Sequence, residues 1–258
     1  MAPADTSKRL NGTVAIITGA ARGCGRAAVE LFLEQGAKVV GTDKDANSGS
    51  ALANQLQTQN FRFVAADVSE LEDVRRVIDE TISAFKTIDV LFNQAGDIIV
   101  RPYLETTEAD YEFIMRNNVR SVFLMTQAVL PTMLRHGRGS IITTSSVSAS
   151  TATPMEAVYC GSKAAVAQLT RAIAVEFRDK GIRANVINPG FVRTKHGEYE
   201  IEQLRALNVA ASDDDIKAMQ GRMCEPEEVA KVALFLATDD ASFVNGAEIA
   251  VDNTFTAI

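Results

Sequence analysis

The residues of this chain that are best suited to catalysis are a tyrosine and a lysine four positions apart. Tyr159 and Lys163 would share one face of a helix. A phenol, with a pKa near ~10, is a poor base at neutral pH, but an ammonium group close by favours its ionised form. Ser145 and Ser146 end a predicted strand shortly before this pair. A YxxxK pair alone is an ordinary helical pair, so its interpretation depends on the surrounding elements.

A glycine-rich segment follows the first predicted strand. Gly19, Gly23 and Gly25 lie in the sequence TGAARGCG, and a helical pattern begins at once. Glycines let the backbone turn tightly and approach a pyrophosphate, and the free N–H groups of a helix start favour its charge. Gly also ends helices and makes turns, but the position between strand and helix favours a dinucleotide site.

Asp43 ends the second predicted strand, about 20 residues after the glycines, where an acid can accept a hydrogen bond from the adenosine ribose. The 2′-phosphate of NADP would meet this carboxylate, and at ~4 Å and an effective dielectric of 20 two charges interact by about 4 kcal/mol. Arg22, in the glycine loop, would attract that phosphate instead. We give more weight to the short side chain of Asp43, so NAD is favoured and NADP is the disfavoured alternative.

Two later strand ends offer further cofactor contacts. Asp67 and Val68 would hold the adenine with an acceptor and an apolar wall, although Asp67 would also suit the start of the next helix. Asn93, Ala95 and Gly96 follow the fourth strand, on the side where doubly wound sheets bind ligands. A simple turn would explain that segment equally well.

The elements that position these residues alternate between short apolar runs and longer segments of helical period. This pattern predicts a Rossmann-like, doubly wound α/β fold with a seven-stranded parallel sheet and helices on both faces. The length of 258 residues suits one domain, 1–258. The polar segment 194–220 is too long for an ordinary connection, and we interpret it as a substrate lid. The predicted strands are 14–18, 38–43, 61–67, 90–93, 140–146, 183–189 and 248–252, and the helices are 24–35, 46–58, 71–85, 107–135, 159–180 and 226–237.

Composition excludes several classes of protein. The net charge is −7 with no basic run, which argues against nucleic-acid binding. No signal peptide and no stretch of eighteen apolar residues occurs, so we expect a cytoplasmic protein without membrane contact. The three cysteines lack CxxC spacing, and His136 and His196 fall in no triad or ligand spacing, at a helix end and in the lid. We expect no metal.

Nearly the whole chain, from about Leu10, resembles the short-chain dehydrogenase/reductase family. The segments that carry the resemblance are TGAARGCG at 18–25, Asp43, DV at 67–68, NQAG at 93–96, NVRSVF at 118–123, the Ser146/Tyr159/Lys163 spacing, NPGFVRT at 188–194, PEEVA at 226–230 and FVNGAEIAVD at 243–252. The sequence departs from the family pattern at Gln94, Cys24 and Asn253-Thr254, and none of these removes a catalytic group.

The resemblance implies a role for each of four side chains. Tyr159 would be the acid/base at the carbonyl or alcohol oxygen, and Lys163 would lower its pKa and hold the nicotinamide ribose. Ser146 would hydrogen-bond the substrate oxygen and stabilise developing alkoxide charge. Asn118 would anchor a water that links Lys163 to solvent, an assignment that depends on the alignment because Asn117 precedes it.

The resemblance also implies the contacts of cofactor and substrate. Val192 and Thr194 would lie against the nicotinamide carboxamide and phosphates, beside further cofactor residues Cys24, Pro189 and Gly190. Small residues beside the catalytic serine, Val147, Ser148 and Thr153, would help to set the substrate. The expected reaction is the NAD(H)-dependent interconversion of a secondary alcohol and a ketone. Alternatives are an NADPH-dependent carbonyl or acyl-thioester reductase and a dinucleotide sensor without turnover. A homotetramer or homodimer is expected.

Overall fold

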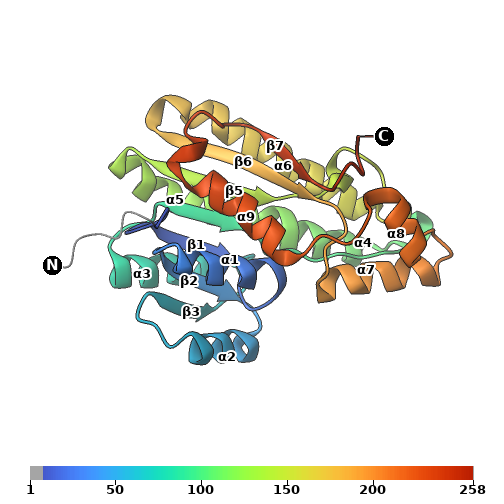
Figure 1. The fold of residues 1–258 in the computed structure, drawn as a ribbon, viewed down its shortest axis with the longest axis horizontal. Helices are drawn as coiled ribbons and strands as arrows, with labels where there is room; N and C mark the ends of the chain where they lie inside the picture. Colours follow the sequence, from blue (N-terminus) through green and yellow to red (C-terminus); the bar gives the residue numbers. More distant parts are fainter. Residues whose placement is uncertain (1–7, 258) are drawn as a thin grey trace.

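Seven parallel strands form the centre of the molecule, in the spatial order β3-β2-β1-β4-β5-β6-β7. The computed structural model describes residues 8–257, and Figure 1 shows the sheet crossing the molecule between layers of helices. The strands are β1 (Val14–Thr18), β2 (Lys38–Asp43), β3 (Phe61–Ala65), β4 (Val90–Asn93), β5 (Gly139–Thr144), β6 (Ile182–Pro189) and β7 (Glu248–Val251). The main helices are α1 (Gly23–Glu34), α2 (Ala46–Leu56), α3 (Leu71–Phe85), α4 (Glu108–Ile114), α5 (Ser121–His136), α6 (Ala157–Phe177), α7 (Lys195–Ala206), α8 (Asp213–Gln220) and α9 (Pro226–Ala237).

Both faces of the sheet are covered, which explains why its strands read as continuous apolar runs. All five residues of β1 and all four of β4 are buried. One apolar core lies between the sheet and α1, α2 and α9, and a second lies between the sheet and α3, α5 and α6. The predicted doubly wound fold is confirmed.

The order of the strands fixes where a ligand can bind. β1 pairs with β2 on one side and with β4 on the other, so the connections leave β1 and β4 in opposite directions. In doubly wound sheets the crevice at this switch point, outside the carboxyl ends of the strands, receives the ligand. The glycine loop after β1 and the segment after β4 therefore face each other.

The predicted helix 107–135 was wrong as a single regular element. The structure divides it into α4, a π-helical turn at Met115–Arg120 and α5. π-helical turns are rare and occur mostly at functional sites, and the apolar period does not reveal them because the chain continues as helix on both sides. Other ends moved by a few residues; the predicted strand 61–67, for example, ends at Ala65.

The segment 194–220 contains two helices, α7 and α8, on a third apolar cluster. Ile201, Leu204 and Ile216 pack there against Ile98, from the segment after β4, and against Tyr159. α8 begins with a capping box of Ser212 and Asp215, so the acidic residues Asp213–Asp215 lie at a helix start, where negative charge is favourable. In Figure 1 these helices lie together at one end of the molecule, beyond the sheet.

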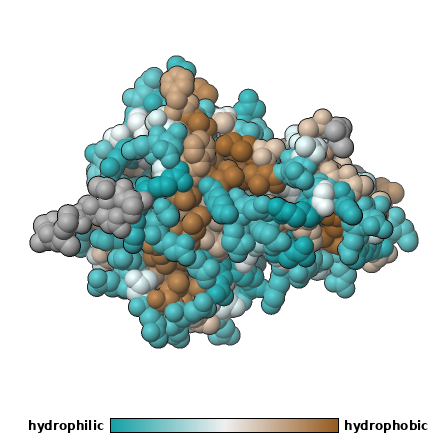
Figure 2. Space-filling view, viewed as in Figure 1, coloured by the Kyte–Doolittle hydropathy of each residue, from teal (hydrophilic) through white to brown (hydrophobic). Residues whose placement is uncertain are grey.

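The surface of one face combines polar cover with a central apolar area. In Figure 2 hydrophilic residues cover most of this face, and hydrophobic ones gather near the middle, where α9 and β7 lie in Figure 1. Among the described residues, no helix is both long and apolar enough to cross a membrane.

Candidate active site

Tyr159, Lys163 and Ser146 come together at the carboxyl end of β5. All three are buried, with 6%, 6% and 8% of their surface exposed. The Nζ of Lys163 lies 5.6 Å from the centre of the Tyr159 ring and donates to the Thr144 carbonyl at 3.1 Å. The Oγ of Ser146 accepts the Ser148 N–H at 3.1 Å. The three predicted catalytic side chains therefore share one site.

Ser145, the weaker candidate of the two serines, has a structural role. Its hydroxyl donates to the Lys163 carbonyl at 2.7 Å and is buried. Neighbouring residues at a strand end point in opposite directions, so Ser145 holds α6 against the sheet while Ser146 faces the cleft. This contact fixes the height of Lys163 along β5.

The electrostatics of Tyr159 differ from the sequence-based expectation. Burial, followed by the carboxyls of Glu200 and Glu156, raises the pKa of Tyr159 well above its usual value, and a hydrogen bond with Ser146 acts in the opposite direction. Burial also lowers the pKa of Lys163 to about 8, against the pull of Asp97 and Glu200. The largest of these effects is therefore burial, which disfavours the ionised phenol.

Asn118 lies in the π-helical turn, 2% exposed. Its Oδ1 accepts the Asp97 N–H at 2.8 Å, and its Nδ2 donates to the Asp97 carbonyl at 2.9 Å and to Ser162 Oγ at 3.0 Å. It thus joins the segment after β4 to α6, close to Lys163: a Cβ on Gly96 would lie 3.2 Å from Asn118 Oδ1 and 3.4 Å from Lys163 Nζ.

The glycine loop forms a cradle that side chains would fill. A Cβ on Gly25 would lie 2.0 Å from the Gly19 carbonyl oxygen, and one on Gly19 would lie 3.0 Å from the backbone of Ala95. Arg22, at the N-cap of α1, makes no capping hydrogen bond with its side chain. The first N–H groups of α1 therefore stay available to an anion, and the cradle fits a dinucleotide pyrophosphate.

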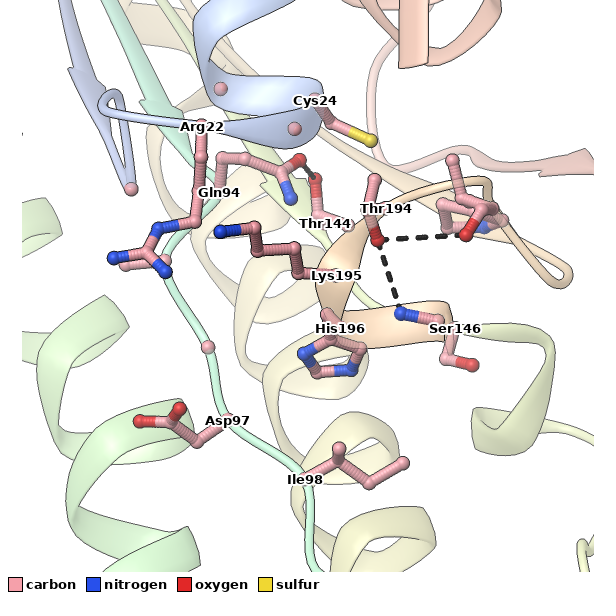
Figure 3. A pocket seen from close by; sticks show the side chains of 18 of the residues that line it. Arg22, Cys24, Gln94, Asp97, Ile98, Thr144, Ser146, Thr194, Lys195 and His196 are labelled. Carbon is pink, nitrogen blue, oxygen red and sulfur yellow. Dashed lines mark hydrogen bonds between the residues drawn. The ribbon is translucent and has the colours of Figure 1, made fainter. Parts of the chain in front are cut away.

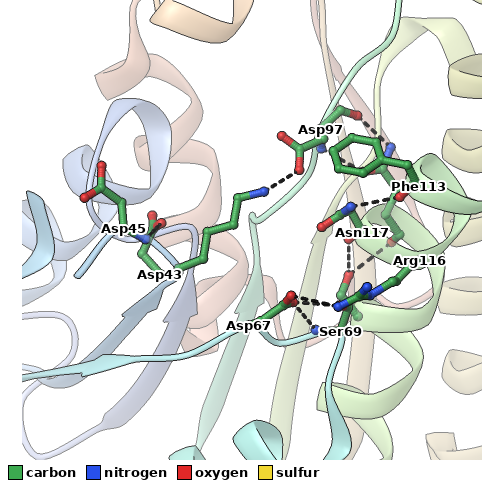
Figure 4. A network of polar contacts seen from close by, with 11 residues as sticks. Asp43, Asp45, Asp67, Ser69, Asp97, Phe113, Arg116 and Asn117 are labelled. Atoms are coloured by element: carbon green, nitrogen blue, oxygen red, sulfur yellow. Dashed lines mark hydrogen bonds and ion pairs between the residues drawn. The ribbon is translucent and has the colours of Figure 1, made fainter. Parts of the chain in front are cut away.

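Acidic and basic side chains alternate at the adenosine end (Figure 4). The carboxylate of Asp43 accepts the N–H groups of Ala21 at 3.1 Å and Asp45 at 3.0 Å, so it also fixes the glycine loop. Arg22 forms an ion pair with Asp45. Lys44 reaches across to Asp97, at 2.8 Å. Each of the two basic side chains therefore has an acidic partner.

Asp67 and Asn93 are placed less freely than the sequence suggested. Asp67 lines the cleft, but its carboxylate accepts from Ser69 Oγ at 2.6 Å and from Arg116 at 3.1 Å (Figure 4). Asn93 does not line the cleft; it is 3% exposed and donates to Thr126 Oγ1 at 3.2 Å. Its position indicates support of the strand end rather than contact with a ligand.

One cleft of about 980 Å³ connects these features. In Figure 3, Arg22 and Cys24 lie at the glycine loop, at one end of the cleft, and Ser146 and His196 lie toward the opposite end of the cleft. Thr194 caps α7 and approaches the loop, since a Cβ on Gly23 would lie 3.1 Å from its Cγ2. All predicted cofactor and substrate residues except Asn93 line the cleft, including Gly19, Val68, Ala95, Gly96, Val147, Ser148, Thr153, Pro189, Gly190 and Val192. Asn118 lies behind it.

Three further residues, to which the sequence assigned no role in the site, lie at the catalytic end. His196 and Glu200 line the cleft from α7, and Glu156 lies behind Glu200. The i, i+4 spacing of His196 and Glu200 indicates a shared helix face only if the lid is known to be helical. The buried Glu156 has no signal in one sequence, because glutamate is ordinarily exposed.

Within the described range 8–257, no group of three or more His, Cys, Asp or Glu side chains is arranged to hold a metal ion. A phosphate cradle, a buried tyrosine–lysine pair and a strand-end serine in one cleft define the site of an oxidoreductase with a dinucleotide cofactor.

Comparison with known proteins agrees with this class. A family model described as enoyl-(acyl carrier protein) reductase matches residues 19–256. D-threitol dehydrogenase of Mycolicibacterium smegmatis is 34% identical over 98% of this chain and 96% of its own, and dehydrogenase/reductase SDR family member 6 of Danio rerio is 36% identical over 95% and 97%. The crystal structure of levodione reductase superposes with a TM-score of 0.90 at 31% identity, covering 96% and 99% of the two chains. The chain belongs to the short-chain dehydrogenase/reductase family, whose members use nicotinamide dinucleotides.

Proposed function

We propose that this protein is an NAD(H)-dependent dehydrogenase that interconverts a secondary alcohol and a ketone. The observation that carries the proposal is the meeting of Ser146, Tyr159 and Lys163 in the same cleft as the glycine cradle. The names of the relatives, a threitol dehydrogenase and a levodione reductase, support an alcohol or carbonyl substrate. Both enzyme hypotheses require this set of proton-handling groups, whereas a dinucleotide sensor without turnover does not.

In the proposed mechanism Tyr159 transfers the proton. Its phenolate oxygen removes the proton of the alcohol oxygen and becomes a hydroxyl, and in the reverse direction that hydroxyl donates its proton to the carbonyl oxygen. Ser146 donates to the same oxygen and stabilises the charge that develops on it. The NAD nicotinamide, when bound, takes up or supplies the hydride.

Lys163 and Asn118 support the tyrosine from behind. Lys163 lines the cleft, and its ammonium donates to the Thr144 carbonyl. Asn118 fixes the backbone of Asp97 opposite α6 and lies close to Lys163, since a Cβ on Gly96 would be within 3.4 Å of both side chains. In this proposal Asn118 would anchor a water that links Lys163 to solvent and carries away the proton that Tyr159 releases.

The preference for NAD is supported by the pairing of charges at the adenosine end. Arg22, the residue that favours NADP, pairs with Asp45, and Lys44 pairs with Asp97. A 2′-phosphate would have to compete with these carboxylates and approach Asp43 as well. The NADPH-dependent alternative requires Arg22 to leave Asp45.

Replacement of Tyr159 tests the mechanism. Tyr159→Phe removes the hydroxyl and keeps the ring in its apolar cluster, so turnover of a secondary alcohol should be lost while NADH still binds, as followed by its fluorescence. Retained turnover would contradict the assignment of Tyr159. Loss of NADH binding together with turnover would instead indicate that the ring holds the cofactor.

We further propose a homodimer or homotetramer. Large apolar side chains are exposed on adjoining helices, for example Tyr111 on α4 and Phe123 on α5, each with nearly half of its surface accessible. Such patches on a folded chain mark contact surfaces. Sedimentation equilibrium would test this: a single species of 27.8 kDa would contradict it.

A further inference from the structure

Two polar side chains of α7 face the catalytic end of the cleft. His196 and Glu200 are one helical turn apart, and both line the cleft. The ring of His196 lies 6.2 Å from that of Tyr159, centre to centre. A substrate whose oxygen contacts Tyr159 would therefore have its neighbouring atoms beside these two residues.

Glu156 lies directly behind Glu200. It is fully buried, and neither of its carboxyl oxygens has a well-formed hydrogen bond. The polar groups that reach it are Thr153 and the carboxyl of Glu200, and burial raises its pKa to about 7. Two carboxyls in contact repel when both are ionised, so they share a proton and titrate as one unit.

No basic side chain in the described part of the chain forms an ion pair with Glu200. Burial and the neighbouring Glu156 raise the pKa of Glu200 well above its usual value, and Lys163 acts in the opposite direction. Buried polar groups in folded proteins are nearly always hydrogen-bonded. Glu200 faces the cleft with only the Glu156 carboxyl behind it, so its outward oxygen is an acceptor for a ligand.

His196 supplies the opposite hydrogen-bonding character. Burial and the nearby charge of Lys163 lower its pKa to about 4, against the pull of Asp97, so the imidazole is neutral at neutral pH. A neutral imidazole has one N–H donor and one acceptor nitrogen. Together, a carboxyl acceptor and an imidazole donor match a hydroxyl group, which donates and accepts.

We propose that His196 and Glu200 form a subsite for a second hydroxyl of the substrate, with Glu156 as the positioning residue behind Glu200. This inference rests on the proposed function, and it makes vicinal diols and longer polyols the preferred alcohols. The short separation of the His196 and Tyr159 rings favours a hydroxyl on the carbon next to the reacting one.

An ammonium group would suit the carboxyl pair alone but not its surroundings. Lys163 already places a positive charge near the Tyr159 ring, and it disfavours protonation of His196. A cationic substrate would meet the same repulsion. A neutral hydroxyl avoids it and uses both members of the subsite.

The test compares butane-2,3-diol, butan-2-ol and 3-aminobutan-2-ol with the complete protein and NAD. We expect kcat/KM for the diol to exceed that for butan-2-ol at least 100-fold, because a site built to bind a hydroxyl rejects the analogue that lacks it. The amino alcohol should fall below the diol. Equal kcat/KM values for the diol and butan-2-ol would overturn the inference and leave the proposed function standing. A preference for the amino alcohol would overturn the assignment of the subsite to a hydroxyl. If none of the three compounds is turned over, both the inference and the proposed function are contradicted.

Variants assign the preference to its residues. Glu200→Leu should lower the diol to butan-2-ol ratio at least tenfold, and Glu200→Gln should restore part of it, because an amide still accepts a hydrogen bond. Glu202→Leu, at an exposed position of the same helix, is the matched control and should leave the ratio unchanged. Glu156→Gln should raise KM for the diol more than it changes kcat, a split that a merely structural role would not produce. An unchanged ratio in both Glu200 variants overturns the inference.

Discussion

Removal of the charge of Asp43 should change the choice between NAD and NADP. Asp43→Asn keeps the shape of the side chain, and its amide oxygen can still accept one of the two N–H groups, of Ala21 and Asp45, that the carboxylate holds at 3.1 and 3.0 Å. The variant therefore weakens the glycine loop by about one hydrogen bond, or roughly 1 kcal/mol, and removes the repulsion toward a 2′-phosphate.

The expected magnitude follows from the charges. At ~4 Å and an effective dielectric of 20 the repulsion is about 4 kcal/mol, which corresponds to roughly 1,000-fold in an equilibrium constant. Asp43 is partly exposed in an open cleft, so water and salt screen part of this. We therefore expect the ratio of kcat/KM with NAD to that with NADP to fall by about 10- to 100-fold.

The assay measures initial rates with each cofactor at fixed alcohol concentration. Asp45→Asn is an informative companion, because it frees Arg22 from its ion pair and should shift the ratio in the same direction by a smaller amount, as exposed ion pairs contribute only about 0–1 kcal/mol. Asp240→Asn removes an acid that pairs with Arg9 on another part of the surface and serves as the control. An unchanged ratio in Asp43→Asn would refute the role of Asp43 in cofactor choice.

Three further substitutions test the cradle, the π-helical turn and the surface. Gly25→Ala should lower stability by about 1–3 kcal/mol and weaken NADH binding, because its Cβ would lie 2.0 Å from the Gly19 carbonyl oxygen. Gly161→Ala, whose Cβ would have no atom within 4 Å, is the control and should change neither quantity. Thermal melting and NADH titration measure the two effects. Asn118→Ala removes two hydrogen bonds to the Asp97 backbone and one to Ser162 Oγ, so it should lower both Tm and kcat more than Asn117→Ala, which loses one bond to Phe113. A larger loss with Asn117→Ala would reverse the assignment. The hydrogen bond with Arg222 lowers the pKa of Glu228 to about 2, so the stability that this pair adds is present above the unfolded pKa of about 4.5 and is lost as the pH falls toward 2. Glu228→Gln should therefore lower Tm at pH 7. A difference in Tm between variant and parent that persists at pH 2 would contradict this.

Much of the fold could be predicted because its strands are buried on both faces. Val14–Thr18 and Val90–Asn93 read as short apolar runs, and the structure has strands with the same ends. The prediction of one regular helix at 107–135 failed because the chain continues as helix on both sides of the π-helical turn, so the apolar period does not reveal it. The turn places Asn118 against Asp97, a contact between segments that the local pattern cannot contain.

The candidate site could be predicted where glycine or spacing reports backbone geometry. Gly19 has a positive φ of 65°, and the i, i+4 pair of Tyr159 and Lys163 depends only on the helix. Asn93 was harder to interpret, since a residue at a strand end can face the ligand or the neighbouring helix. His196 and Glu200 were not recognised as site residues, because the polar lid shows no evident helical period. The apolar residues of its helices pack in a cluster separate from the two cores of the sheet.

The same burial that disfavours ionisation of Tyr159 gives its neighbours their influence. In a low dielectric, each charge or hydrogen bond near the phenol acts more strongly than it would in water. Glu200 and Glu156 raise the pKa of Tyr159 and Ser146 lowers it, so the balance among these side chains sets how readily the proton moves. A substrate hydroxyl that donates to Glu200 would stabilise the carboxyl pair and so reduce the extent to which the pair raises the pKa of Tyr159. Substrate recognition and proton transfer would then depend on one set of neighbouring side chains.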